Sequence, residues 1–306
     1  MTVRKSLAIA ASAAALLALG LTGCSSAASG TAAAGKDVTC PNGKIKFGIL
    51  PYEDPSRLEP AYKTLAKALE KKLDCPVEVV ITEDYAAEVL AMENGKLDVA
   101  EFGPLGFVFA SERAKAVPLV SFGDSEGKPT TYTAGIWVKK DSPVKTLDDL
   151  KGHTLALGSP GSTSGDAFPM SALKDAGIDK EVRSDYAGGH PEALLALVNG
   201  TVDAAEINSQ TLESAKSEGK FDESKFRQVW KSNPIPNDPI TVRSDAPQEF
   251  QDAVKKAFLE LDPKDVAEVG KFLDVDPAGP MIEVTKETYQ PLFDLAKTMG
   301  LTEKDV

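Results

Sequence analysis

The chain has 306 residues, with 46 acidic and 34 basic side chains and a formal net charge of −12 at pH 7. A surface this acidic argues against nucleic acid or an anionic membrane surface as a partner. The chain is nevertheless long enough to form two compact lobes with separate hydrophobic cores.

The N-terminal segment has the layout of an export signal. Arg4 and Lys5 precede an apolar stretch over residues 7–21 and small residues before Cys24. The apolar stretch is shorter than the roughly 20 residues of a membrane-spanning helix. Leu21-Thr22-Gly23-Cys24 resembles the bacterial lipobox, in which the signal is removed and the cysteine is lipidated. We therefore expect a signal peptide over 1–23, a flexible tether over 24–38, and an extracytoplasmic protein held to the cell membrane only by a lipid on Cys24.

Two further cysteines, Cys40 and Cys75, remain after the lipobox. An exported protein sits where disulfides persist, so an even pair is best explained as a disulfide. Two unpaired thiols are the alternative. A Cys-x-x-Cys redox or metal site is excluded by the spacing, no His/Cys/carboxylate cluster has metal-ligand spacing, and we expect neither a metal nor a cofactor.

The first half of the folded part alternates apolar runs with helical patterns. We predict a βαβαβ unit with strands over 45–50, 77–81 and 97–102, and helices over 58–73 and from Tyr85 to Asn94-Gly95. This alternation is typical of a parallel sheet flanked by helices.

The second half repeats the pattern. The predicted elements are strands over 153–157, 181–186 and 202–207, and helices over 164–176 and 190–198. Residues 94–101 and 199–206 are identical at five of eight positions, and both begin with Asn-Gly after a predicted helix. The fold class is therefore α/β, with two similar lobes.

The segments between and after the halves complete the plan. We predict strands over 117–122 and 130–138, the second crossing between lobes near Tyr132, and a return crossing over 232–242. Helices over 247–261, 265–273 and 286–299 would cover the first lobe. Lobe 1 would then comprise residues 39–131 and 235–306, and lobe 2 residues 132–234, with the two crossings as hinge.

A loop rich in small residues, Gly158 to Asp166, separates a predicted strand from a helix. Ser162, Thr163 and Ser164 would present hydroxyls and backbone N–H groups at the positive end of that helix, an arrangement that binds oxyanions. An ordinary Ser/Thr helix cap is the competing explanation. Tyr85 and His190 each lie nine residues before an Asn-Gly, at a helix start and at the carboxyl end of a parallel strand, where open α/β sheets bind ligands.

Four motifs follow one another along the chain: the lipobox, Ser162-Thr163-Ser164-Gly165, Gly188-Gly189-His190-Pro191-Glu192 and Ile235-Pro236-Asn237-Asp238-Pro239. Because of the order and spacing of these motifs, the chain resembles the phosphonate and phosphite binding proteins of ABC importers. The resemblance implies a two-lobe, type II periplasmic-binding-protein fold that closes over one ligand and delivers it to a permease and its ATPase. It implies a monomer whose ligand residues are Ser162, Thr163, Ser164, Tyr85, Tyr132, His190 and Asp238.

The chain departs from the relatives that bind aminoalkylphosphonates. By a gap-free count from His190, Gln210 stands where those relatives have a glutamate for the ammonium group, and Phe102 stands where they have a tyrosine. Glu206, four residues before Gln210, could take the place of that glutamate only in a different register. Both departures favour phosphite, methylphosphonate or phosphate. Asp238 should select a protonated oxyanion or an amino-bearing ligand and reject sulfate, because a carboxylate repels an oxyanion unless a proton or an ammonium group lies between them.

Two other functions stay open. A secreted phosphate-ester hydrolase is disfavoured because Thr163 occupies the nucleophile position of the Gly161-to-Gly165 loop, and because the chain has only two histidines. No P-loop is present. The same fold could instead bind a sulfonate or a thiamine precursor. We expect Trp137 and Trp230 in the core, Tyr52 away from direct ligand contact and His153 without a partner.

Overall fold

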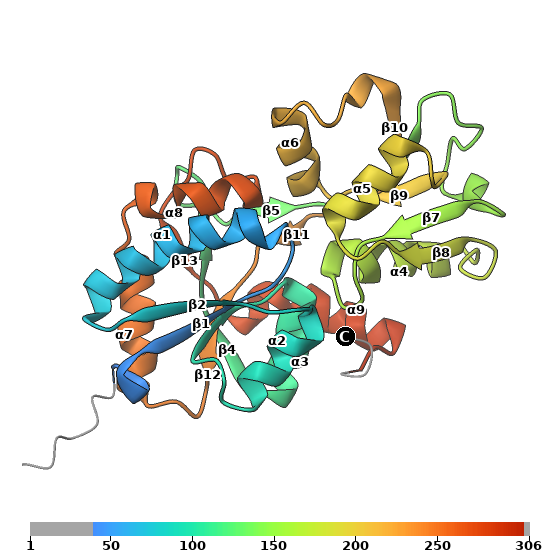
Figure 1. Cartoon of the computed structure of the whole chain (residues 1–306). Helices are drawn as coiled ribbons and strands as arrows, with labels where there is room; N and C mark the ends of the chain where they lie inside the picture. Colours follow the sequence, from blue (N-terminus) through green and yellow to red (C-terminus); the bar gives the residue numbers. More distant parts are fainter. Residues whose placement is uncertain (1–38, 303–306) are drawn as a thin grey trace, which may run out of the picture. The chain divides into compact units, whose positions relative to one another are not determined.

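The computed structural model describes residues 39–302. The predicted signal peptide, the lipobox with Cys24 and nearly all of the predicted tether lie outside the described residues. Within residues 39–302 the strands form a six-stranded sheet, a five-stranded sheet and a two-stranded ribbon (Figure 1). None of the helices in this range combines the length and apolar character needed to cross a bilayer.

The six-stranded sheet has the order β13-β4-β12-β3-β1-β2. Its strands are β1 (Ile45–Ile49), β2 (Val77–Ile81), β3 (Val99–Glu101), β4 (Ala116–Phe122), β12 (Ile240–Arg243) and β13 (Met281–Glu283). Strands β1, β2 and β3 are parallel to one another. Strand β12 runs antiparallel to β3, and β4 runs antiparallel to β12 and β13. The predicted parallel βαβαβ unit is present, and we call this sheet with its helices the first lobe.

Helices cover both faces of the first sheet (Figure 1). On one face α1 (Pro55–Leu73), α7 (Gln248–Leu259) and α8 (Pro263–Gly270) enclose one core. On the other, α2 (Tyr85–Glu93), α3 (Pro104–Arg113) and α9 (Gln290–Met299) enclose a second. The three C-terminal helices therefore cover the first lobe as expected, whereas α3 had no counterpart in the sequence prediction.

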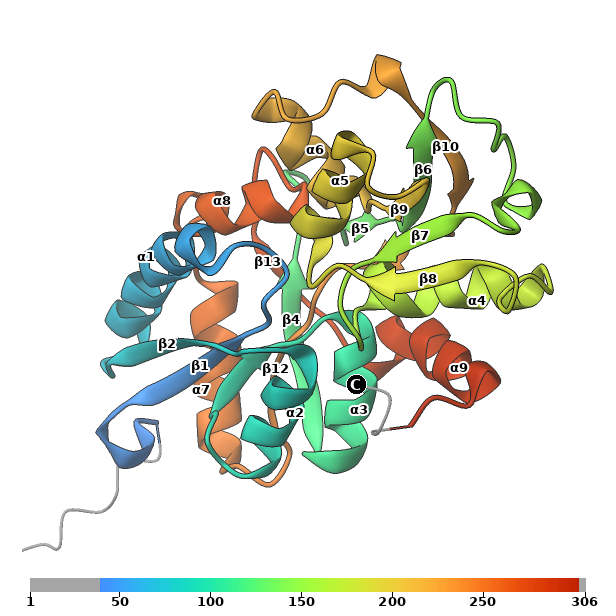
Figure 2. The same ribbon diagram turned by 45° about the vertical axis from the view of Figure 1, so that its right-hand side comes forward.

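The five-stranded sheet has the order β10-β6-β9-β7-β8. It comprises β6 (Gly135–Lys139), β7 (Thr154–Leu157), β8 (Arg183–Tyr186), β9 (Ala204–Glu206) and β10 (Phe226–Lys231). Helices α5 (His190–Asn199) and α6 (Ser209–Ser217) pack on one face, and α4 (Phe168–Asp175) packs on the other (Figure 2). We call this sheet with these helices the second lobe. The sequence prediction had missed α6 and β10.

The chain crosses between the lobes twice, and the two crossing segments pair with each other as β-strands. β5 (Thr131–Tyr132) and β11 (Ile235–Pro236) form the antiparallel two-stranded ribbon. The prediction of one continuous strand over residues 130–138 is wrong, because β5 ends at Tyr132 and β6 begins at Gly135. The interruption has a physical reason: β5 pairs only with β11 in the ribbon, whereas β6 joins the second sheet. The exact lobe boundaries remain a prediction.

Local details differ from expectation at three places. The helix expected from Ser164 begins as one turn of π-helix over Thr163–Ala167 and continues as α4. His153 does have a partner, since its Nδ1 lies 3.3 Å from Oδ2 of Asp203. Trp230 is only partly buried. Short 3-10 turns occupy Pro41–Gly43, Asp148–Leu150, Glu223–Lys225, Lys271–Leu273 and Lys286–Tyr289.

The two cysteines of the first lobe form a disulfide. The Sγ atoms of Cys40 and Cys75 are 2.00 Å apart, and their Cα atoms are 5.4 Å apart. Cys40 precedes β1 and Cys75 precedes β2, so the bridge joins the amino ends of two neighbouring parallel strands. It therefore lies at the edge of the sheet opposite to the carboxyl ends.

Candidate functional site

A small cavity lies where the two lobes meet. Its volume is about 20 Å³, which is room for about one water molecule. The predicted ligand residues that line it are Tyr85, Tyr132, Ser162, Thr163, His190 and Asp238. Ser164 is buried beside the cavity but does not line it. The fold thus gathers residues far apart in the sequence at one point.

Most of the cavity wall is made of helix starts. Tyr85 begins α2, His190 begins α5 and Thr163 begins the π turn before α4. Gly103 and Asn208 are the N-caps of α3 and α6. The N-terminus of a helix carries partial positive charge and free N–H groups, and no lysine or arginine lines the cavity. The electrostatics of this cavity therefore favour an anion held by dipoles.

The hydroxyl of Ser162 is engaged as an acceptor. The backbone N–H of Gly165 donates to its Oγ at 3.1 Å, and Nε2 of His190 lies 3.2 Å away. A Cβ on Gly165 would lie 2.9 Å from Ser162 Oγ and 2.8 Å from the imidazole, so only glycine fits this place in the Ser-Thr-Ser-Gly sequence. The bond from Gly165 makes Ser162 the N-cap of the π turn, as the helix-cap explanation expects, and the hydroxyl still has one proton that it can donate.

The hydroxyls of Thr163 and Ser164 also accept hydrogen bonds from the protein. Thr163 Oγ1 accepts from the backbone N–H of Leu105 at 2.9 Å, and Ser164 Oγ accepts from Nδ2 of Asn208 at 3.0 Å. A hydroxyl has one proton and two acceptor positions, so each of these oxygens can still donate. Donor protons are what an oxyanion requires. Because Leu105 belongs to the first lobe, the Thr163 bond also joins the lobes.

A buried histidine–carboxylate pair supports the loop. His190 Nδ1 lies 2.6 Å from Oε1 of Glu206, which is fully buried at the end of β9. Burial by itself would lower the pKa of His190, but the adjacent Glu206 carboxylate outweighs burial and raises it. Burial raises the pKa of Glu206, and His190 opposes that change. A protonated imidazole donates at both nitrogens, one proton to Glu206 and one toward Ser162.

Two phenols complete the donor set. Burial, reinforced by the nearby Asp238, raises the pKa of both Tyr85 and Tyr132. The Ser162 hydroxyl beside Tyr85 and the Thr163 hydroxyl beside Tyr132 oppose this change. Both phenols therefore keep their protons at neutral pH and can act as hydrogen-bond donors.

Asp238 is the acidic member of the wall. Burial raises the pKa of its carboxyl to about 8, and His190 opposes the shift. Its side chain makes no hydrogen bond to another residue in the range 39–302, although its backbone carbonyl accepts from Ser121 at 2.8 Å. At neutral pH the carboxyl group is therefore mostly protonated.

The family model described as "ABC transporter, phosphonate, periplasmic substrate-binding protein" matches residues 47–289. The chain belongs to this family. It is 30% identical to the "Phosphonates-binding periplasmic protein" of Escherichia coli K12 over 221 residues, covering 70% of this chain and 65% of that protein. It is 30% identical to the "Phosphate-import protein PhnD" of Mycolicibacterium smegmatis over 228 residues, covering 71% of each.

A solved structure supports the fold. PhnD1 of Prochlorococcus marinus, solved in complex with methylphosphonate, matches with a TM-score of 0.73 and 21% identity, covering 85% of this chain and 99% of that one. The type II periplasmic-binding-protein fold expected from the resemblance is thus confirmed. Membership of this family places the chain among the extracytoplasmic substrate-binding components of ABC transporters. The relatives named above are transport proteins and not enzymes.

In this member of the phosphonate-binding family, the cavity wall also contains residues that the sequence does not predict as ligand residues. They are Leu50, Tyr52, Gly103, Asn208 and Gln210. Leu50 and Tyr52 follow β1, Gly103 follows β3 and Asn208 follows β9. Proximity to the carboxyl end of a predicted parallel strand was therefore the signal that could have found them. The hydroxyl of Tyr52 lies 3.0 Å from that of Tyr62, within the first lobe.

The two departures from aminoalkylphosphonate-binding relatives have distinct surroundings. Gln210 Nε2 donates to Oδ1 of Asn237 at 2.9 Å and to the carbonyl of Leu273 at 3.2 Å. The Leu273 carbonyl can only accept, so it fixes the orientation of the amide. Phe102 is buried in the core shared by α2, α3 and α9 and does not line the cavity.

The part of the chain that the structure describes contains no group of three or more His, Cys, Asp or Glu side chains placed to hold a metal ion. The side-chain donors that line the cavity are hydroxyls, phenols, an imidazole and the amides of Asn208 and Gln210.

Proposed function

We propose that this protein is the extracytoplasmic solute-binding lipoprotein of an ABC importer, and that it binds a small phosphorus oxyanion between its lobes. The candidates are phosphite, a phosphonate such as methylphosphonate, and phosphate. The observation that carries the proposal is the hydrogen bonding of the loop hydroxyls. Ser162 and Thr163 line the cavity, and each accepts a hydrogen bond from the protein and has one proton to donate. Ser164, beside the cavity, accepts a bond in the same way. Tyr85, Tyr132 and His190 would add further donors.

The size and chemistry of the wall support a compact ligand. With room for about one water molecule, the cavity must widen as the lobes separate and reclose around the anion. Hydrogen bonds to a charged group contribute roughly 1.5–3 kcal/mol each, so four or five give micromolar or tighter binding after association costs. Gln210 is neutral and offers an ammonium group no countercharge, which supports a ligand without an ammonium group.

Asp238 would supply the selectivity. While protonated, its carboxyl can donate to any oxyanion. Once ionised, it can still accept the proton of a P–OH group but repels fully ionised sulfate, which brings no proton. This favours ligands that carry a titratable P–OH group.

The proposal extends to the partners. The lipid on Cys24 would be the membrane attachment, residues 24–38 the tether, and residues 39–131 with 235–306 and 132–234 the two closing lobes. The protein would act as a monomer and deliver its ligand to a permease driven by an ATPase.

One observation favours a hydrolase as a second candidate. Ser162, His190 and Glu206 form a hydrogen-bonded chain of the kind found in serine hydrolases, with distances of 3.2 and 2.6 Å. Two features oppose it. The Glu206 carboxylate raises the pKa of His190, which favours the protonated imidazole over the neutral form that could take the serine proton. The backbone of Ser162 is also relaxed (φ −66°, ψ 132°), unlike the strained turn of a nucleophile elbow.

A thermal-shift panel on protein lacking residues 1–24 tests the proposal. Phosphite, methylphosphonate, phosphate, aminoethylphosphonate and sulfate are compared, with a phosphate-ester turnover assay in parallel. We expect one or more of the first three to raise the melting temperature, and neither sulfate nor ester turnover to give a signal. Stabilisation by aminoethylphosphonate alone would overturn the argument from Gln210, and ester turnover would support the hydrolase.

A further inference from the structure

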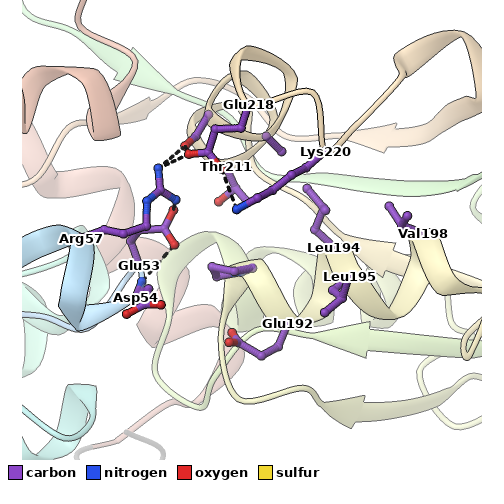
Figure 3. Close-up of a pocket in the computed structure, with 13 residues that line it drawn as sticks. Glu53, Asp54, Arg57, Glu192, Leu194, Leu195, Val198, Thr211, Glu218 and Lys220 are labelled. Atoms are coloured by element: carbon purple, nitrogen blue, oxygen red, sulfur yellow. Dashed lines mark hydrogen bonds and ion pairs between the residues drawn. The ribbon is translucent and has the colours of Figure 1, made fainter.

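An arginine near the cavity joins the two lobes. Arg57, in the first turn of α1, donates from Nη1 to Oε2 of Glu53 at 2.8 Å. Its Nη2 lies 3.3 Å from Oγ of Ser214 and is paired with Glu218, both of the second lobe. The guanidinium also lies 5.1 Å from the ring centre of Phe272 in the first lobe. Figure 3 shows Arg57 between Glu53 and Glu218.

The position of this arginine has no explanation within its own helix. A positive charge in the first turn opposes the helix dipole, and Glu53 offsets that cost only in part. Glu218 has a second ion-pair partner within the second lobe: Nζ of Lys220 lies 2.7 Å from Oε2 of Glu218 (Figure 3). The contact between lobes is thus a network of charges and not a single exposed pair.

The network lies directly outside the cavity. Tyr52, His190 and Gln210 belong to the wall of the cavity. The next residue in the sequence after each of them, Glu53, Pro191 and Thr211, lines the neighbouring pocket of Figure 3. Arg57 and Glu218 line the same pocket. Their side chains are only 31% and 27% exposed, so solvent screens this pair less than a fully exposed one.

We propose that Arg57 and Glu218 form a clasp that closes the lobes over the ligand and slows its release. The contact requires both lobes together, so it forms on closure and breaks before the ligand leaves. Neither residue lines the cavity. The clasp therefore changes the equilibrium between open and closed forms and not the contacts to the anion. The inference rests on the proposed function in so far as closure traps a ligand.

Kinetics of ligand release test the clasp. We expect Arg57→Gln to release methylphosphonate, or phosphite if that is the tighter probe, about tenfold faster, equivalent to about 1.4 kcal/mol, with little change in association rate. Glu218→Gln should act similarly, and the double variant should add little to either change, because both remove the same contact. Wild-type release should accelerate with salt more than release from Arg57→Gln.

A matched control exists in the first lobe. Arg113 pairs with Glu93 at 2.6 Å, with side chains 28% and 35% exposed, and both residues belong to one lobe. Arg113→Gln should leave release unchanged. Release from Arg57→Gln at the wild-type rate, or equal acceleration by Arg113→Gln, would overturn the clasp.

A measurement without ligand separates this inference from the proposed function. Small-angle X-ray scattering of the unliganded protein should give a larger radius of gyration for Arg57→Gln than for wild type and Arg113→Gln. If no phosphorus oxyanion binds wild-type protein, the proposed function fails while the scattering result still decides whether the clasp holds the lobes. Equal radii for all three proteins would contradict the clasp.

Discussion

The hydroxyl of Thr163 accepts a hydrogen bond from the backbone N–H of Leu105, at 2.9 Å and across the two lobes. Pro104 precedes Leu105 and has no N–H, and the N-cap Gly103 offers no side chain, so helix α3 lacks a side-chain cap of its own. A Cβ on Gly103 would lie 3.5 Å from Thr163 Oγ1, in contact with it. The second lobe thus caps a helix of the first with the same hydroxyl that we propose donates to the anion.

Removing this hydroxyl should weaken binding by two routes. We expect Thr163→Val to lose the bond to Leu105 and the bond to the anion, and to reduce affinity about 10- to 100-fold. Thr163→Ser should stay within about threefold of wild type, because the hydroxyl remains. Calorimetric titration with methylphosphonate or phosphite measures both.

Thr241→Val is the matched control for the two Thr163 variants. Thr241 is fully buried in the first sheet, and its hydroxyl donates to the carbonyl of Ala100 at 3.1 Å. The substitution should lower the melting temperature without changing affinity. Equal affinity losses for the valine variants at 163 and 241 would show that Thr163 acts only through stability.

Asp238 should make binding dependent on pH. Its pKa of about 8 means that the carboxyl is neutral below that pH and repels an anion above it. Wild-type affinity should therefore fall as pH rises beyond 8, and Asp238→Asn should lack this fall and discriminate less between phosphorus oxyanions and sulfate. Parallel pH profiles, or unchanged discrimination in calorimetry, would refute the role.

The same shift has a consequence for folding. Because the pKa of Asp238 is raised from 3.8 in the folded protein, the native state binds more protons than the unfolded state between about pH 4 and 8. The free energy of unfolding contributed by this group therefore falls as pH rises through that window. Asp238→Asn should flatten this slope in denaturation experiments, and a slope equal to that of wild type would contradict the shift.

Glu206 should keep His190 protonated. In Glu206→Gln the carboxylate that raises the pKa of His190 is gone, while burial still lowers it. The imidazole should become neutral near pH 7, and anion affinity should drop about tenfold or more because one charged donor is lost. Nitrogen-15 NMR of the imidazole reports the protonation state independently of binding.

Asp203→Asn is the control for the histidine pair. His153 and Asp203 also pair, but at the surface, with side chains 31% and 45% exposed. Neither the affinity nor the NMR signature of His190 should change. If Glu206→Gln left His190 protonated, the account of the pair would be wrong.

The disulfide should stabilise the fold without touching the site. Linking residues 35 apart constrains the unfolded chain by about 3–4 kcal/mol. The variant with Cys40→Ala and Cys75→Ala should therefore melt about 10 °C lower. Ligand affinity should be unchanged, because the bridge joins the amino ends of β1 and β2 and the cavity lies at the carboxyl ends. A loss of affinity at a temperature where the variant is folded would contradict this separation.

Sequence periodicity predicted the parallel units of both lobes, because a helix or strand that buries one face leaves a regular apolar pattern. The repeat of residues 94–101 in 199–206 then placed Tyr85 and His190 at equivalent helix starts. Helix α3 escaped prediction because it is buried almost all round at residues 104–110, which removes the contrast between faces.

The partners within the site could not be predicted from local patterns. Glu206 was visible as the last residue of the repeat, yet its contact with His190 depends on how α5 packs against β9. The bond between Leu105 and Thr163 joins residues 58 apart in sequence and requires both lobes in place. The sequence alone indicates no partner for His153, because Asp203 comes close to it only through the pairing of the neighbouring strands β7 and β9.

The central claim is that hydroxyl and phenol donors, together with the protonated imidazole of His190, bind a phosphorus oxyanion between the lobes. Calorimetric titration of protein lacking residues 1–24 with phosphite, methylphosphonate, phosphate and sulfate tests it most directly, with Thr163→Val in parallel. We expect saturable, one-to-one binding of at least one phosphorus oxyanion at micromolar or lower dissociation constant, weakened in the variant, and no binding of sulfate. Absence of binding by all three phosphorus oxyanions, or equal affinity for sulfate, would contradict the claim.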